Sequence, residues 1–428
     1  MATLGTPPKL RELQLALYER AKKERKFRAY ALYDKVYRDD VVAHAYALVK
    51  ANGGAAGVDG TTFEWIEAQG TEAYLQELKE ELKTKRYRPG PVRRVEIPKP
   101  NGGKRPLGIP NVRDRVVQMG VKLLLEPLFE ADFDRDSYGF RPKRDAHQAI
   151  EAVREELGNG MHWVLDADIS SYFDTIPHDR LMKAVAERVV DGAMLALVKM
   201  FLEAPIVDEE DGDGRPRRNR QGTPQGGVIS PLLANIYLNL LDRNFRRRVQ
   251  NGELRGRLIR YADDFVLLTP CRPERERAWV EGILGRLGLR LHPEKTRVLD
   301  ARVDLVAFLG FSVRWRYDRT YLDVSAKAQE RIRDQLRRKT SRPERSLPEV
   351  IGELNEYIRG ARAYFRQVRR RTLSKLDYFV GQRLARWWAQ KHARRRPAWS
   401  LVWEGPIRRD LERWWASRQP GAPSRRAT

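Results

Sequence analysis

The start of the chain is expected to be helical, because apolar residues recur there at the spacing of one helix face. Leu10, Leu13 and Leu17 lie among many charged residues, which predicts a helical arm over residues 1–50. Glycine-rich segments then break the pattern and indicate a loop. Residues 51–150 are the next expected domain. Its predicted elements are a charged helix near 71–86 and a basic hairpin with strands over 92–97 and 104–109.

Residues 151–325 combine strand and helix patterns, which predicts an α+β core. The expected elements are a strand over 163–168, helices within 178–204, a helix from about Ser230, a strand pair over 258–268 and a hairpin over 311–321. The segment from Asp208 to Arg220 is too polar to pack, so we expect it to form a solvated loop or hairpin tip.

From residue 326 onward the pattern is helical. Ser346 with Glu349 three residues later predicts a capping box at the start of one of these helices. Residues 326–428 hold 27 Lys plus Arg against 10 Asp plus Glu, so they carry +17 of the chain's net charge of +24. This basic excess predicts a polyanionic partner, and nucleic acid is the usual one.

Tryptophan is also concentrated in this C-terminal quarter. Flat rings among cations suit unstacked bases, and the ordinary alternative is that they fill a helical core. The six tryptophans are Trp387, Trp388, Trp399, Trp403, Trp414 and Trp415. The single cysteine, Cys271, excludes internal disulfides, and no apolar stretch is long enough to span a membrane. We therefore expect a soluble, cytoplasmic protein.

Two acidic sites lie at the ends of apolar strand segments. Asp263 and Asp264 separate two such segments, where a solvated turn would more often carry Asn-Gly, and Asp168 ends the strand over 163–168. An adjacent acid pair is by itself an ordinary surface feature. Three converging carboxylates would instead bind Mg²⁺ and support nucleotidyl transfer. Asp166 lies two residues before Asp168 on the same strand face and is a spare candidate.

The chain resembles group II intron-encoded reverse transcriptases of the bacterial type. Eight ordered stretches carry this resemblance: Ile97 to Pro100, Arg105 to Pro110, Tyr138 to Pro142, Asp168 to Asp174, Gln221 to Asn235, Tyr261 to Asp264, Leu291 to Thr296 and Phe308 to Phe311. A looser match over residues 346–400 resembles the maturase-specific thumb.

The resemblance implies a right-hand polymerase with an antiparallel palm sheet and an all-helical thumb. In these terms residues 51–150 are the fingers, 151–325 the palm and 326–428 the basic thumb or maturase domain. The implied activity is RNA-directed DNA polymerase, with Asp168, Asp263 and Asp264 as catalytic acids. Two Mg²⁺ ions, with Mn²⁺ as a possible substitute, would be held by these acids and the Ile169 carbonyl.

The resemblance also implies residues that bind the incoming dNTP. They are Lys99 and Arg105 on the basic hairpin, Phe173 under the sugar, Gln225 and Gly226 in the Pro-Gln-Gly turn, and Lys295 near the leaving phosphates. A ring at Phe173 would disfavour a 2′-hydroxyl and hence RNA synthesis. The alternatives are a core phenylalanine at position 173 and ordinary surface charge at Lys99 and Arg105.

Further residues are implied to contact nucleic acid. Template and primer would meet Arg141, Tyr261, Leu309 and Gly310, and intron RNA would meet Arg362, Arg366, Arg369, Arg370 and Arg371 of the thumb. Arg141 could instead anchor a helix. The implied partners are structured intron RNA, an RNA template with a DNA primer, a DNA target and dNTPs.

Alternative functions stay open at this point. A reverse transcriptase of a defence or repair system would use the polymerase without an intron, and a splicing-only maturase would bind RNA with an idle polymerase site. No cysteine follows Cys271. The Cys-rich nuclease of many relatives is therefore not expected, and a mobile host intron would need a primer from another source.

Overall fold

The computed structural model describes residues 5–98, 103–208, 215–393 and 411. The chain divides into two compact units. The first comprises residues 1–153 and 163–298, and the second comprises residues 154–162 and 299–428. No helix in the described ranges combines the length and the apolar character needed to cross a membrane.

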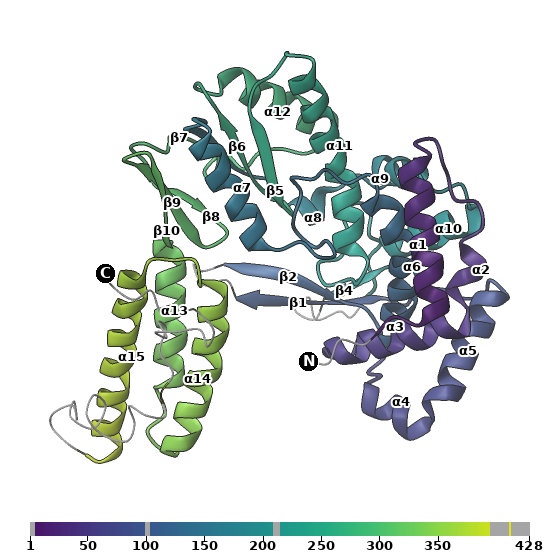
Figure 1. The fold of residues 1–428 in the computed structure, drawn as a ribbon. Helices are drawn as coiled ribbons and strands as arrows, with labels where there is room; N and C mark the ends of the chain where they lie inside the picture. Colours follow the sequence, from purple (N-terminus) through teal and green to yellow (C-terminus); the bar gives the residue numbers. More distant parts are fainter. Residues whose placement is uncertain (1–4, 99–102, 209–214, 394–410, 412–428) are drawn as a thin grey trace. The chain divides into compact units, whose positions relative to one another are not determined.

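The N-terminal helices of the first unit pack against one another and, in part, against one central helix. They are α1 (Pro8–Lys23), α2 (Tyr33–Val36), α3 (Asp39–Asn52), α4 (Phe63–Gln69) and α5 (Thr71–Lys83). The central helix is α6 (Val112–Glu130), against which α1 and α3 lie (Figure 1). Leu10 is fully buried, while Leu13 and Leu17 pack against the same core. The apolar face of the predicted arm is therefore used within the unit.

The basic hairpin forms where the sequence predicts it, but it belongs to a larger sheet. Strands β1 (Val92–Pro98) and β2 (Lys104–Ile109) are antiparallel. A short strand that the sequence pattern did not indicate, β4 (Ile206–Asp208), adds to β1 in parallel. Residues 209–214 of the predicted polar loop lie outside the described residues.

A second sheet carries the predicted acids. Its order is β5 (Arg257–Tyr261), β6 (Asp264–Thr269), β3 (Trp163–Asp168) and β7 (Arg297–Asp300). The three strands predicted from the sequence are confirmed, and β6 is antiparallel to both β5 and β3. The accompanying helices are α7 (Ala146–Gly158), α8 (Tyr172–Thr175), α9 (His178–Ala186), α10 (Gly192–Glu203), α11 (Ser230–Gln250) and α12 (Glu274–Arg286).

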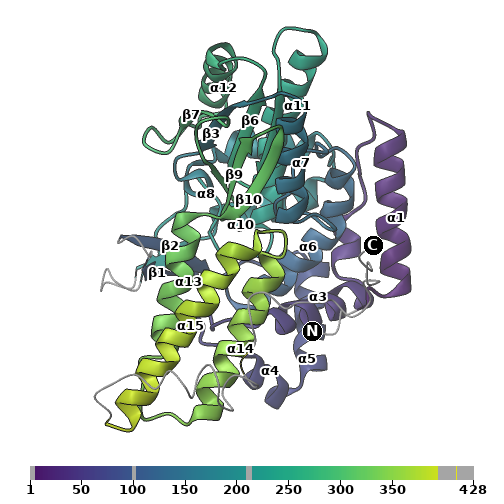
Figure 2. The ribbon, with the colours of Figure 1, turned by 60° about the vertical axis from the view of Figure 1, so that its left-hand side comes forward.

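The second unit joins a small antiparallel sheet to three helices. The sheet contains β8 (Val306–Phe308), β9 (Phe311–Arg316) and β10 (Arg319–Val324). The helices α13 (Ala326–Lys339), α14 (Leu347–Tyr364) and α15 (Arg370–Lys391) run side by side (Figure 2). Phe311 of β9 makes an edge contact with Phe365, with ring centroids 5.2 Å apart, and the Tyr364 hydroxyl donates to the Leu309 carbonyl. These contacts place the hairpin with the helices in the compact second unit, which begins at residue 299, while the thumb border at 326 stays a prediction.

The C-terminal helices carry the predicted capping box and the adjacent tryptophans Trp387 and Trp388. The capping box is confirmed, since Ser346 and Glu349 bond reciprocally at the start of α14. Trp387 is buried and donates its indole N–H to the Arg342 carbonyl, as the core alternative requires. Trp388 packs against His392 with ring centroids 4.3 Å apart. The four later tryptophans lie outside the described residues.

Candidate functional site

The pairing of β3 with β6 brings two of the predicted acids together. Asp168 lies directly opposite Asp264 in this antiparallel register. The backbone N–H of His292 donates to the Asp168 carbonyl on the other side of β3, at 2.7 Å. Asp168 and Asp264 are therefore a non-hydrogen-bonded pair, the kind whose side chains stand closest on one face of a sheet.

The third acid lies in the turn that joins β5 to β6. Tyr261 pairs with Asp264, which leaves Ala262 and Asp263 as a two-residue turn. Ala262 has φ +59°, a left-handed conformation that costs a residue with a Cβ about 1–2 kcal/mol. Gly139 passes directly beneath, because a Cβ on it would lie 2.4 Å from the Ala262 nitrogen. Only glycine allows this close approach.

The Ile169 carbonyl faces the same side of β3 as the turn. The Ser170 N–H donates to the backbone carbonyl of Arg290, and the His292 N–H donates to the backbone carbonyl of Asp168. Ile169 and Leu291, which lie between these bonds, are therefore an antiparallel pair without mutual hydrogen bonds. The peptide groups of Ile169 consequently point toward the β6 side. This direction agrees with the predicted role of its carbonyl as a ligand.

Loss of solvent, together with neighbouring negative charge, raises the pKa of acids in this site. Removal of solvent by the surrounding protein, together with the charges of Asp168, Asp263 and Asp166, raises the pKa of Asp264 to about 7, although part of its side chain remains accessible. Burial also raises the pKa of Asp166 to about 6. A cation at this place would oppose both shifts, because it favours the ionised carboxylates.

Two basic side chains partly offset the acids. Burial and the Asp168 charge raise the pKa of Asp263, whereas Arg105 and Lys295 oppose the rise. The Lys295 ammonium forms an ion pair with the Asp168 carboxylate. Across the described ranges, no three His, Cys, Asp or Glu side chains form a ready-made cation site. Lys295 therefore supplies positive charge where the donor set would suit a hard cation.

A buried arginine that sequence reasoning missed holds the acidic turn. Arg260 in β5 has 0% exposure, and its Nε and Nη2 donate to both carboxylate oxygens of Asp242 at 2.5–3.0 Å. Its Nη1 donates to the Asn235 amide oxygen at 2.9 Å and to the Ala262 carbonyl at 2.8 Å. Asn235 in turn donates to the Gly139 carbonyl at 2.8 Å. The side chains of Arg260 and Asn235 thus connect α11, the acidic turn and the Gly139 turn beneath it.

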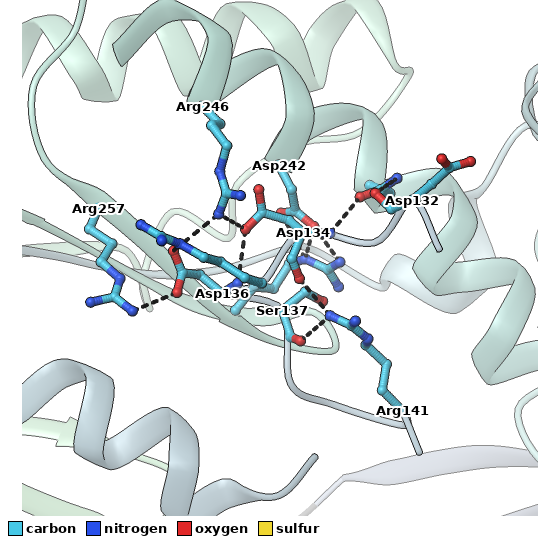
Figure 3. A network of polar contacts seen from close by, with 11 residues as sticks. Asp132, Asp134, Asp136, Ser137, Arg141, Asp242, Arg246 and Arg257 are labelled. Carbon is cyan, nitrogen blue, oxygen red and sulfur yellow. Dashed lines mark hydrogen bonds and ion pairs between the residues drawn. The ribbon is translucent and has the colours of Figure 1, made fainter. Parts of the chain in front are cut away.

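The chain segment beside this arginine is itself held by ion pairs (Figure 3). Asp136 accepts from Arg257 at 2.7 Å and from Arg246 at 3.3 Å, and Arg246 also pairs with Asp134. Burial and the nearby Asp242 charge raise the pKa of Asp134 to about 6. The backbone of this segment then bonds to β5 through Asp136 and Arg260, at 2.9 Å. The network therefore fixes the position of β5 and of the acidic turn at its end.

Arg141 belongs to this anchoring network. Its side chain is 3% exposed and forms a two-pronged pair with Glu130. Its Nη1 donates to the Asp134 and Ser137 carbonyls at 2.5 Å (Figure 3). Of the two roles predicted for Arg141, this placement favours anchoring and leaves little side chain for a template contact. Two sequence features could have indicated these buried arginines. Arg260 interrupts an apolar strand, and Arg141 follows Gly139 and Phe140 in a turn.

The predicted nucleotide-binding residues lie on adjoining segments. Arg105 Nε donates to the Gln225 amide oxygen at 2.8 Å, and the Gln225 amide donates to Asp174 at 3.2 Å. Gly226 has φ +115°, and a Cβ there would lie 2.4 Å from the Gly108 carbonyl oxygen. The Pro-Gln-Gly turn therefore lies against β2. Asp174 ends this series of hydrogen bonds, and sequence reasoning gave it no role.

Phe173 lies at the border between core and surface. Its ring is 9% exposed and makes an edge contact with Tyr172, whose hydroxyl donates to the Ala234 carbonyl. The residue is thus part of the core, and the sugar contact stays a prediction. Lys99 lies outside the described residues, and Tyr261 is half-buried at the end of β5.

The other predicted nucleic-acid contacts belong to the second unit. Leu309 and Gly310 have φ +49° and +78° and form the turn between β8 and β9. Arg366, Arg369, Arg370 and Arg371 are exposed, and Arg362 is half-buried in α14. Their roles stay predictions.

Comparison with known proteins identifies two matching families. The family described as "Reverse transcriptase (RNA-dependent DNA polymerase)" matches residues 97–313, about half of the chain. "Group II intron, maturase-specific domain" matches residues 327–404. The protein YkfC of Escherichia coli (strain K12) is 37% identical over 363 residues, which cover 76% of this chain and 93% of that protein.

Intron-encoded proteins are similar over shorter stretches. The group II intron-encoded protein LtrA of Lactococcus lactis subsp. cremoris is 37% identical over 215 residues, covering 50% of this chain and 34% of LtrA. The putative COX1/OXI3 intron 1 protein of Saccharomyces cerevisiae is 28% identical over 326 residues, covering 64% and 38%. The chain thus spans about a third of the length of these two relatives.

We predict that Arg260→Lys lowers the rate of nucleotide incorporation by about 10–100-fold with little change in the KM for nucleotide, because a small displacement of the turn misplaces Asp263. Arg260→Met alone, which leaves the buried Asp242 carboxylate without its partner, should also destabilise the fold by about 3–5 kcal/mol. The double variant Arg260→Met with Asp242→Leu should regain much of the lost stability while the rate stays low. If kcat recovers together with Tm, Arg260 has only a structural role.

Proposed function

The chain belongs to the group II intron-encoded reverse transcriptases and is an RNA-directed DNA polymerase, and we propose that it binds its intron RNA, assists splicing and copies that RNA into cDNA. The single observation that supports catalysis is the opposed pair Asp168 and Asp264, with Asp263 in the adjoining turn. Like charges at neighbouring positions of the sheet and its turn repel one another, and a cation would offset that repulsion. Retention of the three acids fits a working polymerase site better than an idle one.

Enzymes of this family use divalent metal ions, and we propose two Mg²⁺ here, with Mn²⁺ as a substitute. Asp168, Asp263, Asp264 and the Ile169 carbonyl would hold them, since all four supply oxygen atoms and hard cations prefer such ligands. When bound, the ions activate the primer 3′-hydroxyl and stabilise the leaving pyrophosphate. The anchored turn lets the protein present its acids without reorganising at each addition.

The remaining residues are proposed to bind and orient the dNTP. Arg105 offers a guanidinium to the triphosphate, and its bond to Gln225 holds it beside the Pro-Gln-Gly turn. Lys295 pairs with Asp168, and its ammonium group would move to pair with phosphate oxygens as the nucleotide enters. Phe173 would close the space beneath the sugar.

The second unit is proposed to bind structured intron RNA. Arg369, Arg370 and Arg371 stand at the start of α15, whose first turn has no acidic residue. Cations at a helix N-terminus oppose the helix dipole, so this placement suits a partner that supplies anions. We further propose an RNA template with a DNA primer, a DNA target and dNTPs as partners, and a cytoplasmic ribonucleoprotein as the working form.

Asp263→Asn is expected to reduce extension of a DNA primer on an RNA template by more than about a hundredfold, which exceeds the effect typical of outer-sphere partners of a metal. RNA binding without dNTPs should be unchanged. Asp166→Asn is the matched control and should retain most of the activity. Equal extension by wild type and Asp263→Asn would exclude the proposed metal site.

Phe173→Val should raise ribonucleotide incorporation relative to deoxynucleotide by about tenfold or more, because space opens for a 2′-hydroxyl. Phe201→Val is the control, since Phe201 is also buried but stacks on Tyr87. Both variants lose core packing, so stability should fall in each. An unchanged ratio of kcat/KM values for the two nucleotide types would reject the sugar contact.

Replacing Arg369, Arg370 and Arg371 together by Gln should weaken RNA binding and reduce the slope of log Kd against log salt by about 2–3, for three lost phosphate contacts. The control replaces three exposed arginines of the first unit, Arg247, Arg275 and Arg286. The slope should change much less in that control. An unaltered slope in the α15 variant would refute the assignment.

A further inference from the structure

The β9–β10 hairpin has one face that packs and one that carries cations. Val313 lies opposite Leu322 in the register, and both are buried. Because side chains alternate along a strand, the neighbouring positions point to the other face. That outward face carries Arg314 opposite Tyr321 and Arg316 opposite Arg319. Figure 2 shows the two strands side by side.

A fourth arginine joins this face from the segment before α15. The Arg369 guanidinium lies 3.9 Å from the centre of the Tyr321 ring, and the Arg369 N–H donates to the Leu322 carbonyl at 3.4 Å. The stacking holds the guanidinium over the sheet. Arg314, Arg316, Arg319 and Arg369 thus form one continuous surface, called the hairpin arginine face below.

The hairpin arginine face keeps an excess of positive charge, since Asp323, opposite Ser312, is the one acid at the outward strand positions. None of its four arginines forms an ion pair with an acid of the described residues. Arg316 and Arg319 are exposed and directly opposite each other, and like charges in that position destabilise a strand pair. Arginines that only keep a hairpin soluble would not need this arrangement. A partner with regularly spaced anions would relieve it.

The tip of the hairpin adds an exposed aromatic ring. Tyr317 and Asp318 have φ +51° and +52°, as in a type I′ turn, where Asn and Gly are preferred. Tyr317 is 75% exposed, and its recorded ring contact is with Arg316, 4.8 Å away. The ring does not serve the core, and the left-handed backbone disfavours it. Such a residue suits stacking on an unpaired base.

We propose that the hairpin arginine face binds a single-stranded stretch of RNA, with the four guanidinium groups on consecutive phosphates and Tyr317 stacked on an unpaired base. The inference rests on the proposed function only in taking RNA as the partner. It assigns a contact to β9 and β10, separate from the arginines at 370 and 371. Bases inside a duplex cannot reach Tyr317, so an unpaired segment is the target.

Binding is measured by fluorescence anisotropy with the full chain, without dNTPs or divalent ions, so the outcome does not depend on polymerase activity. The probes are an unstructured RNA, a single-stranded DNA of the same sequence and an RNA duplex with the same number of phosphates. The variants are Arg316→Gln with Arg319→Gln, and Tyr317→Ser. Arg247→Gln with Arg275→Gln is the control, because it removes the same charge from exposed positions of the first unit.

The Arg316 and Arg319 double variant should bind the unstructured RNA about tenfold more weakly, with a salt slope lower by about 1.4, for two phosphates of a single strand. Its Tm should equal or exceed that of wild type, since a repulsion is removed. Tyr317→Ser should weaken binding to the unstructured RNA by about tenfold and leave duplex binding unchanged.

Three results would overturn the proposal. The first is unchanged RNA binding in both variants. The second is an equal loss in the Arg247 and Arg275 control, which would show a general charge effect. The third is a loss confined to the duplex or to DNA, which would assign the face to another nucleic acid. Primer extension on a short annealed substrate at saturating concentration separately tests the polymerase.

Discussion

The contact on which the catalytic site depends is the one from Arg260 to the Ala262 carbonyl. A two-residue turn with a left-handed alanine is not held by its own backbone preferences, and the acids that flank it repel one another. The buried pair with Asp242 fixes the guanidinium, which then fixes the turn. Burying the Arg260 and Asp242 charges costs their solvation by water. The hydrogen bonds of the Arg260 guanidinium to Asp242, Asn235 and Ala262 offset that cost.

Like charges lie close together in both units of the molecule. The palm sheet concentrates carboxylates at one strand end, and the hairpin of the second unit concentrates arginines on one face. Each arrangement costs stability in the isolated chain, and each would be relieved by a partner of opposite charge, a hard cation in one case and a phosphate backbone in the other. A nucleic-acid complex with bound metal ions would supply both of these partners.

Much of the fold could be predicted because local patterns agree with it. The strand over 163–168, the strand pair around the acidic turn and the capped start of α14 form where periodicity and capping chemistry place them. The short strand β4 could not be found, since three residues carry no measurable period. The hairpin's place in the second compact unit could not be found either, because the contacts of Phe311 and Leu309 with α14 join segments that are distant in sequence.

The sequence by itself determined which acids could act and which strands would carry them, because an apolar run that ends in aspartate is a local signal. Only the tertiary structure decided that Asp168 stands opposite Asp264, since register depends on pairing between strands about a hundred residues apart. The structure also decided that Arg260 and Arg141 are internal supports while Arg316 and Arg319 are exposed. An arginine has the same chemistry in all four places, and its burial and partners, which arise from packing, separate the roles.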